Sequence, residues 1–190
     1  NSNDYNWTDV VMSNLGEWHT KAISLHYYTV PTGDWNKKGS ATEFSDEEYY
    51  ETISKTLYMD ELIKRHSEIM SRRDPEGKIG LIVDEWGCWY DVEEGTNPGF
   101  LYQQNTMRDA IVNIFNNHSD KVVMANLAQA VNVLQSLILT EGEKMVKTPT
   151  YHVFDLFKTH QGGELCYSYA NNCQAGGKIP MISQSASVKD

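Results

Sequence analysis

Residues 79–90 read Ile-Gly-Leu-Ile-Val-Asp-Glu-Trp-Gly-Cys-Trp-Tyr, and this stretch is the most informative part of the chain. Its apolar start has no helical period, which predicts a buried strand. The strand is expected to end at two carboxylates, Asp84 and Glu85, with aromatic residues beside them. In an α/β fold, ligands and catalytic groups collect at the carboxyl ends of parallel strands, and a glutamate beside tryptophans suits a sugar ring. Taken alone, however, an Asp-Glu pair is more often an acidic junction between a strand and a loop.

The rest of the chain alternates between predicted strands and helices. Strands are expected at residues 22–28, 78–84 and 121–126, and helices at 7–16, 105–117 and 150–160. Residues 30–44 and 95–99 are interpreted as loops, and 127–140 as a mixed apolar segment. Three successive strand and helix units predict an α/β fold with a parallel sheet and right-handed crossovers. This pattern alone does not distinguish a doubly wound sheet from a barrel.

A further long helix is expected to begin after Ser45. Ser45 and Glu48 have the spacing of a capping box. Apolar residues then recur at near-helical intervals until the turn residues 74–77 end the helix. After about residue 161 the helical period gives way to Gly, Ser and short alternating runs, which predicts the start of a β-domain.

Charge and hydropathy argue against two classes of partner. The formal net charge of −10 is unfavourable for nucleic-acid binding, which usually needs a clustered basic face. The densest basic stretch, residues 64–73, lies at the end of the predicted long helix, where cations complement the helix dipole. No apolar run approaches the roughly 20 residues that cross a bilayer, so no membrane span is expected.

Cysteine and histidine usage points to neither a disulfide scaffold nor a metal site. Three cysteines are too few for such a scaffold, and the pair close in sequence, Cys166 and Cys173, could bridge across a turn or stay free. Cys88 is expected to be a small buried residue. The six histidines are scattered and never four apart on a predicted helix, so no metal and no cofactor is expected.

Six segments of the chain, in this order and spacing, closely resemble the α-L-arabinofuranosidases of glycoside hydrolase family 51. They are residues 5–8 (Tyr-Asn-Trp-Thr), 23–28 (Ile-Ser-Leu-His-Tyr-Tyr), 83–87 (Val-Asp-Glu-Trp-Gly), 124–129 (Met-Ala-Asn-Leu-Ala-Gln), 131–135 (Val-Asn-Val-Leu-Gln) and 148–154 (Thr-Pro-Thr-Tyr-His-Val-Phe). The resemblance implies a retaining hydrolase on a (β/α)8 TIM barrel, followed by a C-terminal β-sandwich. Such an enzyme removes terminal L-arabinofuranose from plant glycans such as arabinan and arabinoxylan.

The chain would cover only part of that architecture. By the resemblance, residues 1–160 form the C-terminal half of the barrel, from about its fifth unit, and residues 161–190 begin the sandwich. Both ends of the chain are interpreted as cuts within a longer protein, since it starts without Met and ends in what resembles an interrupted strand.

The resemblance also implies which residues carry the chemistry. A retaining glycosidase uses one carboxyl group as nucleophile and another as acid/base, roughly 5 Å apart. By its match to the Asp-Glu-Trp block, Glu85 would be the nucleophile, with Trp86 packed beneath the site and Asp84 orienting its neighbours. The family's acid/base belongs to an Asn-Glu pair on an earlier strand, and no Asn-Glu dipeptide occurs in these 190 residues. The acid/base is therefore expected upstream of residue 1.

Four further residues match substrate-binding positions of the family. His26 and Tyr28 would line the sugar subsite, and the tyrosine would hydrogen-bond the nucleophile and keep it ionised. Gln129 would bond sugar hydroxyls, and Trp89 would pack on the aglycone side. Without the resemblance, His26 is better interpreted as a core histidine and Gln129 as polar surface.

The expected function is that of a non-reducing-end α-L-arabinofuranosidase. Its partners would be glycans that contain arabinofuranose, it would require the N-terminal half of the barrel, and it would form a homo-oligomer as the family commonly does. Two alternatives stay open. One is a retaining β-glycanase of the same barrel clan, since those enzymes also use a strand-end glutamate beside tryptophan. The other is a non-catalytic carbohydrate-binding barrel fragment, which an upstream Asn-Glu strand end would argue against.

Overall fold

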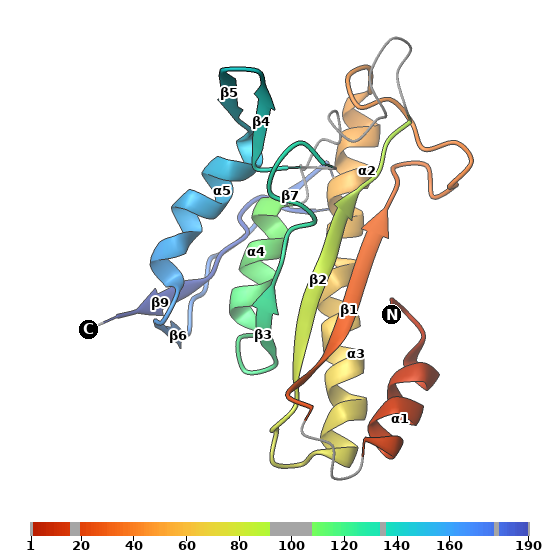
Figure 1. Cartoon of the computed structure of the whole chain (residues 1–190), viewed down its shortest axis with the longest axis vertical. Coiled ribbons are helices and arrows are strands. Elements are labelled where there is room, and N and C mark those ends of the chain that lie inside the picture. The colour runs from red at the N-terminus through yellow and green to blue at the C-terminus, as the bar shows by residue number, and fades with distance from the viewer. Residues whose placement is uncertain (1, 16–19, 92–107, 134–135, 177–178, 190) are drawn as a thin grey trace.

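Three parallel strands form the main sheet, in the spatial order β1-β2-β3 (Figure 1). The computed structural model describes residues 2–15, 20–91, 108–133, 136–176 and 179–189. The strands of this sheet are β1 (Ala22–Thr29), β2 (Gly80–Cys88) and β3 (Val122–Ala125). The helices are α1 (Tyr5–Asn14), α2 (Asp46–Thr56), α3 (Tyr58–Arg73), α4 (Arg108–Asn117), α5 (Pro149–Phe157) and the short 3-10 helix η2 (Lys158–His160).

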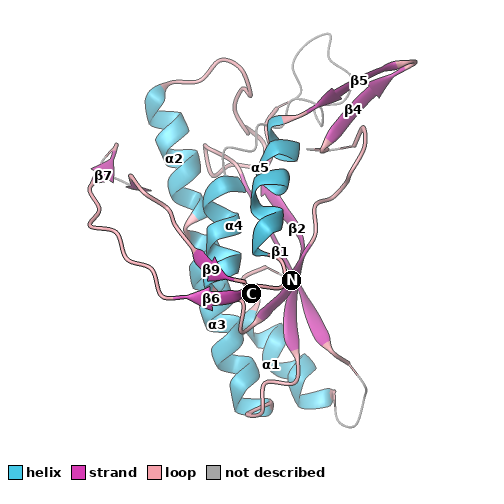
Figure 2. Cartoon of the chain, turned by 90° about the vertical axis from the view of Figure 1, so that its left-hand side faces the viewer, coloured by secondary structure: helices cyan, strands magenta, loops and turns pink. Residues whose placement is uncertain are grey.

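The helices α2, α3 and α4 lie on one face of this sheet, and α1 packs against α3 (Figures 1 and 2). Alternation along β1 explains how the faces differ, because successive side chains of a strand point to opposite sides. Ile23, Leu25 and Tyr27 are buried against the helices, whereas the residues between them are half-buried on the other face. That other face carries no helix among the described residues, and it is called the open face below.

The core lies between the sheet and the helices. Its side chains come from the helix-facing positions of the strands and from the inward stripes of the helices. The largest of them that are fully buried are Leu25, Met59, Leu62, Ile63, Met70, Leu81 and Trp86. The α/β class expected from the sequence is confirmed.

The predicted long helix is wrong in one respect, because two helices meet at Leu57. The capping box at its start is confirmed: Ser45 Oγ accepts from the Glu48 N–H at 3.2 Å, and Glu48 Oε2 accepts from the Ser45 N–H at 2.8 Å. The break coincides with a contact from the sheet. The hydroxyl of Tyr27 donates to the Lys55 carbonyl at 2.8 Å, so an outside donor takes an acceptor of the helical ladder.

The same lysine holds the carboxyl end of β1. Lys55 Nζ donates to the carbonyls of Val30, at 2.8 Å, and Pro31, at 2.6 Å. Burial raises the pKa of Tyr27 to about 12, so its hydroxyl stays protonated and able to donate. The end of β1 is therefore fixed to the junction of α2 and α3.

A buried histidine joins α1 to α3. The His66 side chain is 1% exposed, and its Nδ1 lies 2.8 Å from the hydroxyl of Thr8. Its Nε2 lies 2.7 Å from the Ser2 carbonyl, which can only accept, so Nε2 carries the proton and Nδ1 accepts from Thr8. Burial lowers the pKa of His66 and keeps the ring neutral.

Most other boundaries lie close to the prediction. The helix α1 begins at Tyr5, two residues before the predicted start, because the Asp4 carboxylate caps the Trp7 N–H at 2.9 Å. The helix predicted at 150–160 ends as α5 at Phe157 and continues as η2. The loop at 95–99 and the first residues of the helix predicted at 105–117 lie outside the described residues.

A hairpin that begins in the predicted mixed segment 127–140 and extends beyond it was not predicted from the sequence. It consists of β4 (Ile138–Glu141) and β5 (Lys144–Lys147), joined at Gly142, whose φ of 57° needs a glycine. Beyond η2 come two short antiparallel pairs, β6 (Glu164–Cys166) with β9 (Ala186–Val188), and β7 (Gln174–Ala175) with β8 (Ile179–Pro180). These short strands agree with the predicted change to β structure, while the division into two domains stays a prediction.

Two remaining features bear on partners. The three cysteines are all free, so Cys166 and Cys173 do not pair. Within the described ranges, no helix is long and apolar enough to cross a membrane.

Candidate active site

A β-bulge shapes the carboxyl end of β2. Along β1 and β2, Leu25 is paired with Val83, but the next residue of β1, His26, is paired with Glu85. Asp84 is thus an extra residue in the ladder. The expectation that the carboxylates follow the end of the strand is wrong, because β2 continues to Cys88. Such a bulge bends the strand and changes which face the following side chains occupy.

The bulge places two consecutive carboxylates on the open face. In a regular strand, Asp84 and Glu85 would point to opposite sides of the sheet. Here both side chains are partly exposed, at 38% and 43%. Trp86 accordingly faces the helices, where it is 0% exposed and packs edge-to-face on Phe115, with ring centroids 5.3 Å apart. The packing role expected for Trp86 is confirmed, while its place beneath a sugar site stays a prediction.

Asp84 is held by two side chains of β1. Its Oδ1 accepts from the hydroxyl of Ser24 at 2.7 Å and lies 2.8 Å from Nε2 of His26. Ser24 and His26 are two residues apart, so they share the open face of β1. One carboxylate oxygen of Asp84 thus contacts both Ser24 and His26, which agrees with the orienting role that the sequence interpretation gave to Asp84.

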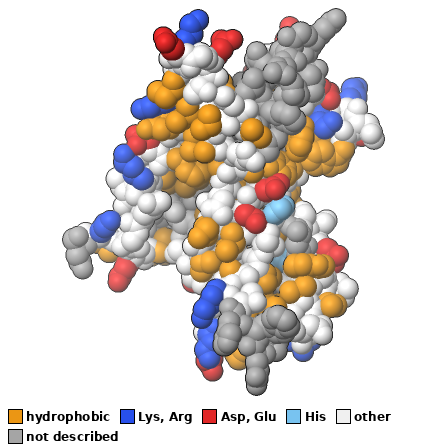
Figure 3. Space-filling model, in the orientation of Figure 1, with side chains coloured by type: hydrophobic (Ala, Val, Ile, Leu, Met, Phe, Trp, Pro, Cys, Tyr) orange, Lys and Arg blue, Asp and Glu red, His pale blue; other side chains and the backbone are white. Residues whose placement is uncertain are grey.

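Glu85 is the carboxylate of this cluster with the fewest restraints. Its Oε2 lies 3.8 Å from Nδ1 of His26, which is beyond hydrogen-bond distance but close enough for an ion pair when the ring is protonated. The Glu85 carboxylate is accessible from the open face. In Figure 3, acidic side chains and a histidine gather at the centre of the molecule, between hydrophobic patches. A reactive carboxylate needs this combination of access and nearby orienting groups.

Aromatic rings flank the cluster at the ends of the strands. Tyr28 and Trp89 lie edge-to-face with centroids 5.6 Å apart, and Trp35 follows at 6.4 Å from Trp89. Trp35 is 48% exposed and was not identified from the sequence. The hydrogen bond predicted between Tyr28 and Glu85 stays a prediction.

The loop that carries Trp35 is fixed to the residues after β2. The backbone N–H of Gly39 donates to the Asp91 carboxylate at 2.9 Å, and the Asp91 N–H donates to the Gly39 carbonyl at 2.9 Å. Gly39 has a φ of 94°, a conformation that glycine adopts without strain. This reciprocal pair keeps Trp35 beside Trp89.

Gln129 is not part of the described contacts of this cluster. It lies in the exposed segment after β3, and its peptide bond to Ala128 is cis. The structure therefore brings His26, Asp84 and Glu85 into contact and Tyr28 against Trp89, while the role of Gln129 stays a prediction.

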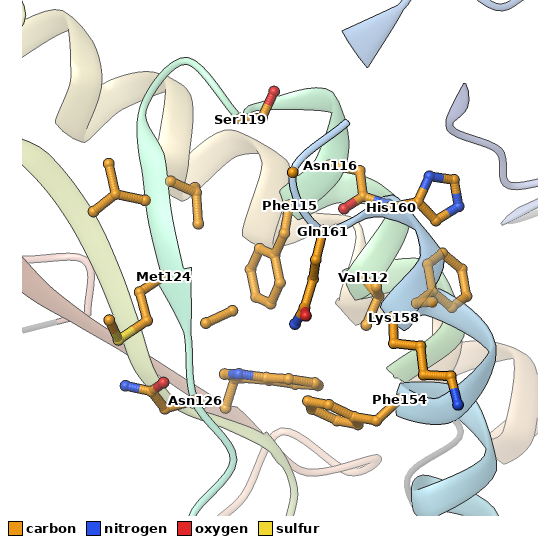
Figure 4. Close-up of a pocket in the computed structure, with 16 residues that line it drawn as sticks. Val112, Phe115, Asn116, Ser119, Met124, Asn126, Phe154, Lys158, His160 and Gln161 are labelled. Atoms are coloured by element: carbon orange, nitrogen blue, oxygen red, sulfur yellow. The ribbon is translucent and has the colours of Figure 1, made fainter. Parts of the chain in front are cut away.

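The larger hollows lie elsewhere. One of about 610 Å³ lies between β3, α4 and α5, and Figure 4 shows Phe115, Met124 and Phe154 around it. None of the described residues that line it is an Asp or Glu. Among the described residues, no group of three or more His, Cys, Asp or Glu could hold a metal ion. The open face of β1 and β2 is accordingly the better candidate for an active site.

Comparisons with known proteins show the family to which the chain is related. The family model of the α-L-arabinofuranosidase C-terminal domain matches residues 84–180, about half of the chain. An intracellular exo-α-L-arabinofuranosidase of Bacteroides ovatus is 51% identical over 163 residues, which cover 83% of this chain and 31% of that protein.

Solved structures of arabinofuranosidases are also similar to this chain. The crystal structure of the family 51 arabinofuranosidase from Xanthomonas axonopodis pv. citri superposes with a TM-score of 0.80 at 45% identity, covering 98% of this chain and 39% of that one. An α-L-arabinofuranosidase from Thermotoga maritima, solved as an arabinose complex, has a TM-score of 0.69 at 26% identity and covers 100% of this chain and 37% of that one. The chain thus spans about a third of the length of these relatives. On these matches, the chain belongs to the α-L-arabinofuranosidases of glycoside hydrolase family 51.

Proposed function

We propose that the complete protein is an exo-acting α-L-arabinofuranosidase that retains the anomeric configuration, and that Glu85 is its nucleophile. The observation that carries this proposal is the β-bulge at Asp84, which presents Glu85 on the open face in the carboxyl-terminal half of a parallel strand. Relatives named as exo-α-L-arabinofuranosidases and family 51 arabinofuranosidases support the reaction class. The substrates would be oligosaccharides or polysaccharides with terminal α-L-arabinofuranosyl residues.

In this mechanism Glu85 attacks the anomeric carbon while the bond to the leaving oxygen breaks. A second carboxyl group protonates that oxygen and later takes a proton from the water that hydrolyses the arabinosyl-Glu85 ester. That group would come from the part of the protein that precedes this chain. The three parallel strands would then be the C-terminal part of a (β/α)8 barrel, with residues 161–190 beginning a β-sandwich.

The neighbouring side chains would form the sugar subsite and its exit. His26, held by Asp84, and Tyr28 would contact the arabinose ring, and Gln129 would bond its hydroxyls. Trp89 would pack against the aglycone. The ring of Trp35, 6.4 Å from that of Trp89, would extend the same aromatic wall.

A rescue experiment tests the role of Glu85. In the complete protein, Glu85→Ala should abolish formation of the covalent intermediate, and azide should restore turnover with inverted stereochemistry because it enters the vacated space. Glu76→Ala provides a matched control, since Glu76 is an exposed glutamate that precedes the opposite end of β2. Near-normal hydrolysis by Glu85→Ala would remove Glu85 from the catalytic role.

A further inference from the structure

The bulged residue Asp84 lacks the backbone pairing that holds its neighbours. It has no partner in the register of β2 with β1, and the register of β2 with β3 ends at Val83. A bulged residue is left out of the ladder, so side-chain contacts must fix its orientation. Those contacts are the hydrogen bond from Ser24 to its Oδ1 and the 2.8 Å ion-pair contact of the same oxygen with Nε2 of His26.

We infer that Ser24 is a positioning residue for the hydrolysis, acting through Asp84 and His26 on Glu85. This inference rests on the proposed function. Ser24 itself contacts neither Glu85 nor the place of the sugar in the described contacts. Its effect passes through one carboxylate oxygen, which it shares with His26.

The shared oxygen fixes the imidazole of His26. Nε2 of His26 lies 2.8 Å from Oδ1 of Asp84, which is an ion-pair distance when the ring is protonated, so this contact holds the ring beside the carboxylate. Nδ1 then faces Glu85, with 3.8 Å between Nδ1 and Oε2. The Ser24 hydroxyl, at 2.7 Å, keeps Oδ1 from rotating away and so helps to hold the imidazole in place.

The same contact also limits the backbone before the nucleophile. Asp84 and Glu85 share a peptide bond, so a change in the orientation of Asp84 displaces the Glu85 carboxylate. Side chain and backbone therefore transmit the effect of Ser24 by two routes to one group. Both routes predict that loss of the Ser24 hydroxyl misplaces the Glu85 nucleophile and leaves the acid/base group unaffected.

That distinction gives the experiment a specific readout. The burst rate of the complete protein is measured with two aryl arabinofuranosides, one with a good and one with a poor leaving group. Loss of acid assistance slows only the poor leaving group, whereas a misplaced nucleophile slows both. Ser24→Ala should lower the burst rate roughly 10-fold with both substrates and change KM little, since misplacement by a fraction of an ångström has an effect of this order.

Two variants separate positioning from general damage. Ser24→Thr retains the hydroxyl on a strand-compatible side chain and should keep the burst rate near that of the unmodified protein. Ser54→Ala removes another partly buried serine hydroxyl, which donates to the Glu51 carbonyl on α2, and should leave the rate unchanged. If Ser24→Ala folds poorly by circular dichroism, Asp84→Asn takes its place, with both substrates again expected to slow.

The inference is overturned if Ser24→Ala has an unmodified burst rate, if only the poor leaving group slows, or if Ser24→Thr is as slow as Ser24→Ala. Failure of the proposed function has a different signature, because Glu85→Ala would then stay active. An inactive Glu85→Ala together with a normal Ser24→Ala would refute the positioning role alone.

Discussion

The substitution Trp86→Ala should destabilise the protein far more than the same change at Trp35. Trp86 directly follows Glu85, is 0% exposed, and packs on Phe115 and Phe154 with centroids 5.3 Å and 6.3 Å away. Truncation leaves a cavity between the sheet, α4 and α5. Trp35 is 48% exposed, and its truncation leaves no comparable void.

The magnitude follows from the buried area. A buried tryptophan removes roughly 200 Å² from water, which at about 25 cal/mol per Å² is worth roughly 5 kcal/mol. This area relation is an upper bound, and measured truncations of large aromatic residues cost about 3–5 kcal/mol. We therefore expect about 4 kcal/mol for Trp86→Ala and at most about 1 kcal/mol for Trp35→Ala.

The assay is thermal unfolding followed by circular dichroism. If the domain that contains Trp86 melts as a unit, its Tm should fall by roughly 10 °C in Trp86→Ala and by only a few degrees in Trp35→Ala. Similar shifts for the two variants would refute the assignment of Trp86 to the core. They would also refute the inference that the bulge turns the Trp86 side chain toward the helices.

Three further predictions concern pH and the subsites. Burial lowers the pKa of His66 below 6.5, so below that pH the folded state binds fewer protons than the unfolded state. The contribution of His66 to stability is therefore fully present above about pH 6.5 and falls as the pH drops, and Tm should fall between pH 7.5 and 5.5. An equal fall of Tm in His66→Gln would contradict this. Tyr28→Phe should lower kcat by roughly 10²-fold with the fold intact, as loss of a preorganised contact does, and an unchanged kcat would exclude the bond to Glu85. Trp89→Ala and Trp35→Ala should weaken binding of long substrates more than of a small aryl arabinoside, and equal effects on both would argue against the aromatic wall.

Features of the fold that depend on neighbouring residues could be predicted well from the sequence. The capping box of Ser45 and Glu48 forms as expected, and β1 ends within one residue of its predicted end. These features depend on neighbouring residues in the chain. The split between α2 and α3 does not, since it depends on the hydroxyl of Tyr27, which reaches Lys55 from a distant strand.

In the candidate site, too, some features could be predicted from the sequence and others depend on contacts between distant segments. The resemblance identified Glu85, His26 and Tyr28, and the structure places all three on the open face. The bulge itself could not be predicted, because the apolar run before Asp84 has no feature that marks an extra residue; only the ladder with β1 reveals it. Trp35 was missed because a single tryptophan in a polar loop gives no periodic signal.

The missed hairpin had a weak signal. Gly142 stands in the polar stretch Thr-Glu-Gly-Glu-Lys between two short runs that contain apolar residues, and a glycine in such a place is a turn signal. The strands on either side have only four residues each and are largely exposed, so no apolar alternation distinguished them from a loop.

Identification of the residue that carries the sugar is the most direct test of the proposed mechanism. The complete protein is incubated with an activated arabinofuranoside whose covalent intermediate breaks down slowly, then digested and sequenced by tandem mass spectrometry. The arabinosyl ester should lie on Glu85 and be absent from its neighbour Asp84, whose Oδ1 accepts a hydrogen bond from Ser24 and lies 2.8 Å from Nε2 of His26. An ester on Asp84 or on any other residue would contradict Glu85 as the nucleophile.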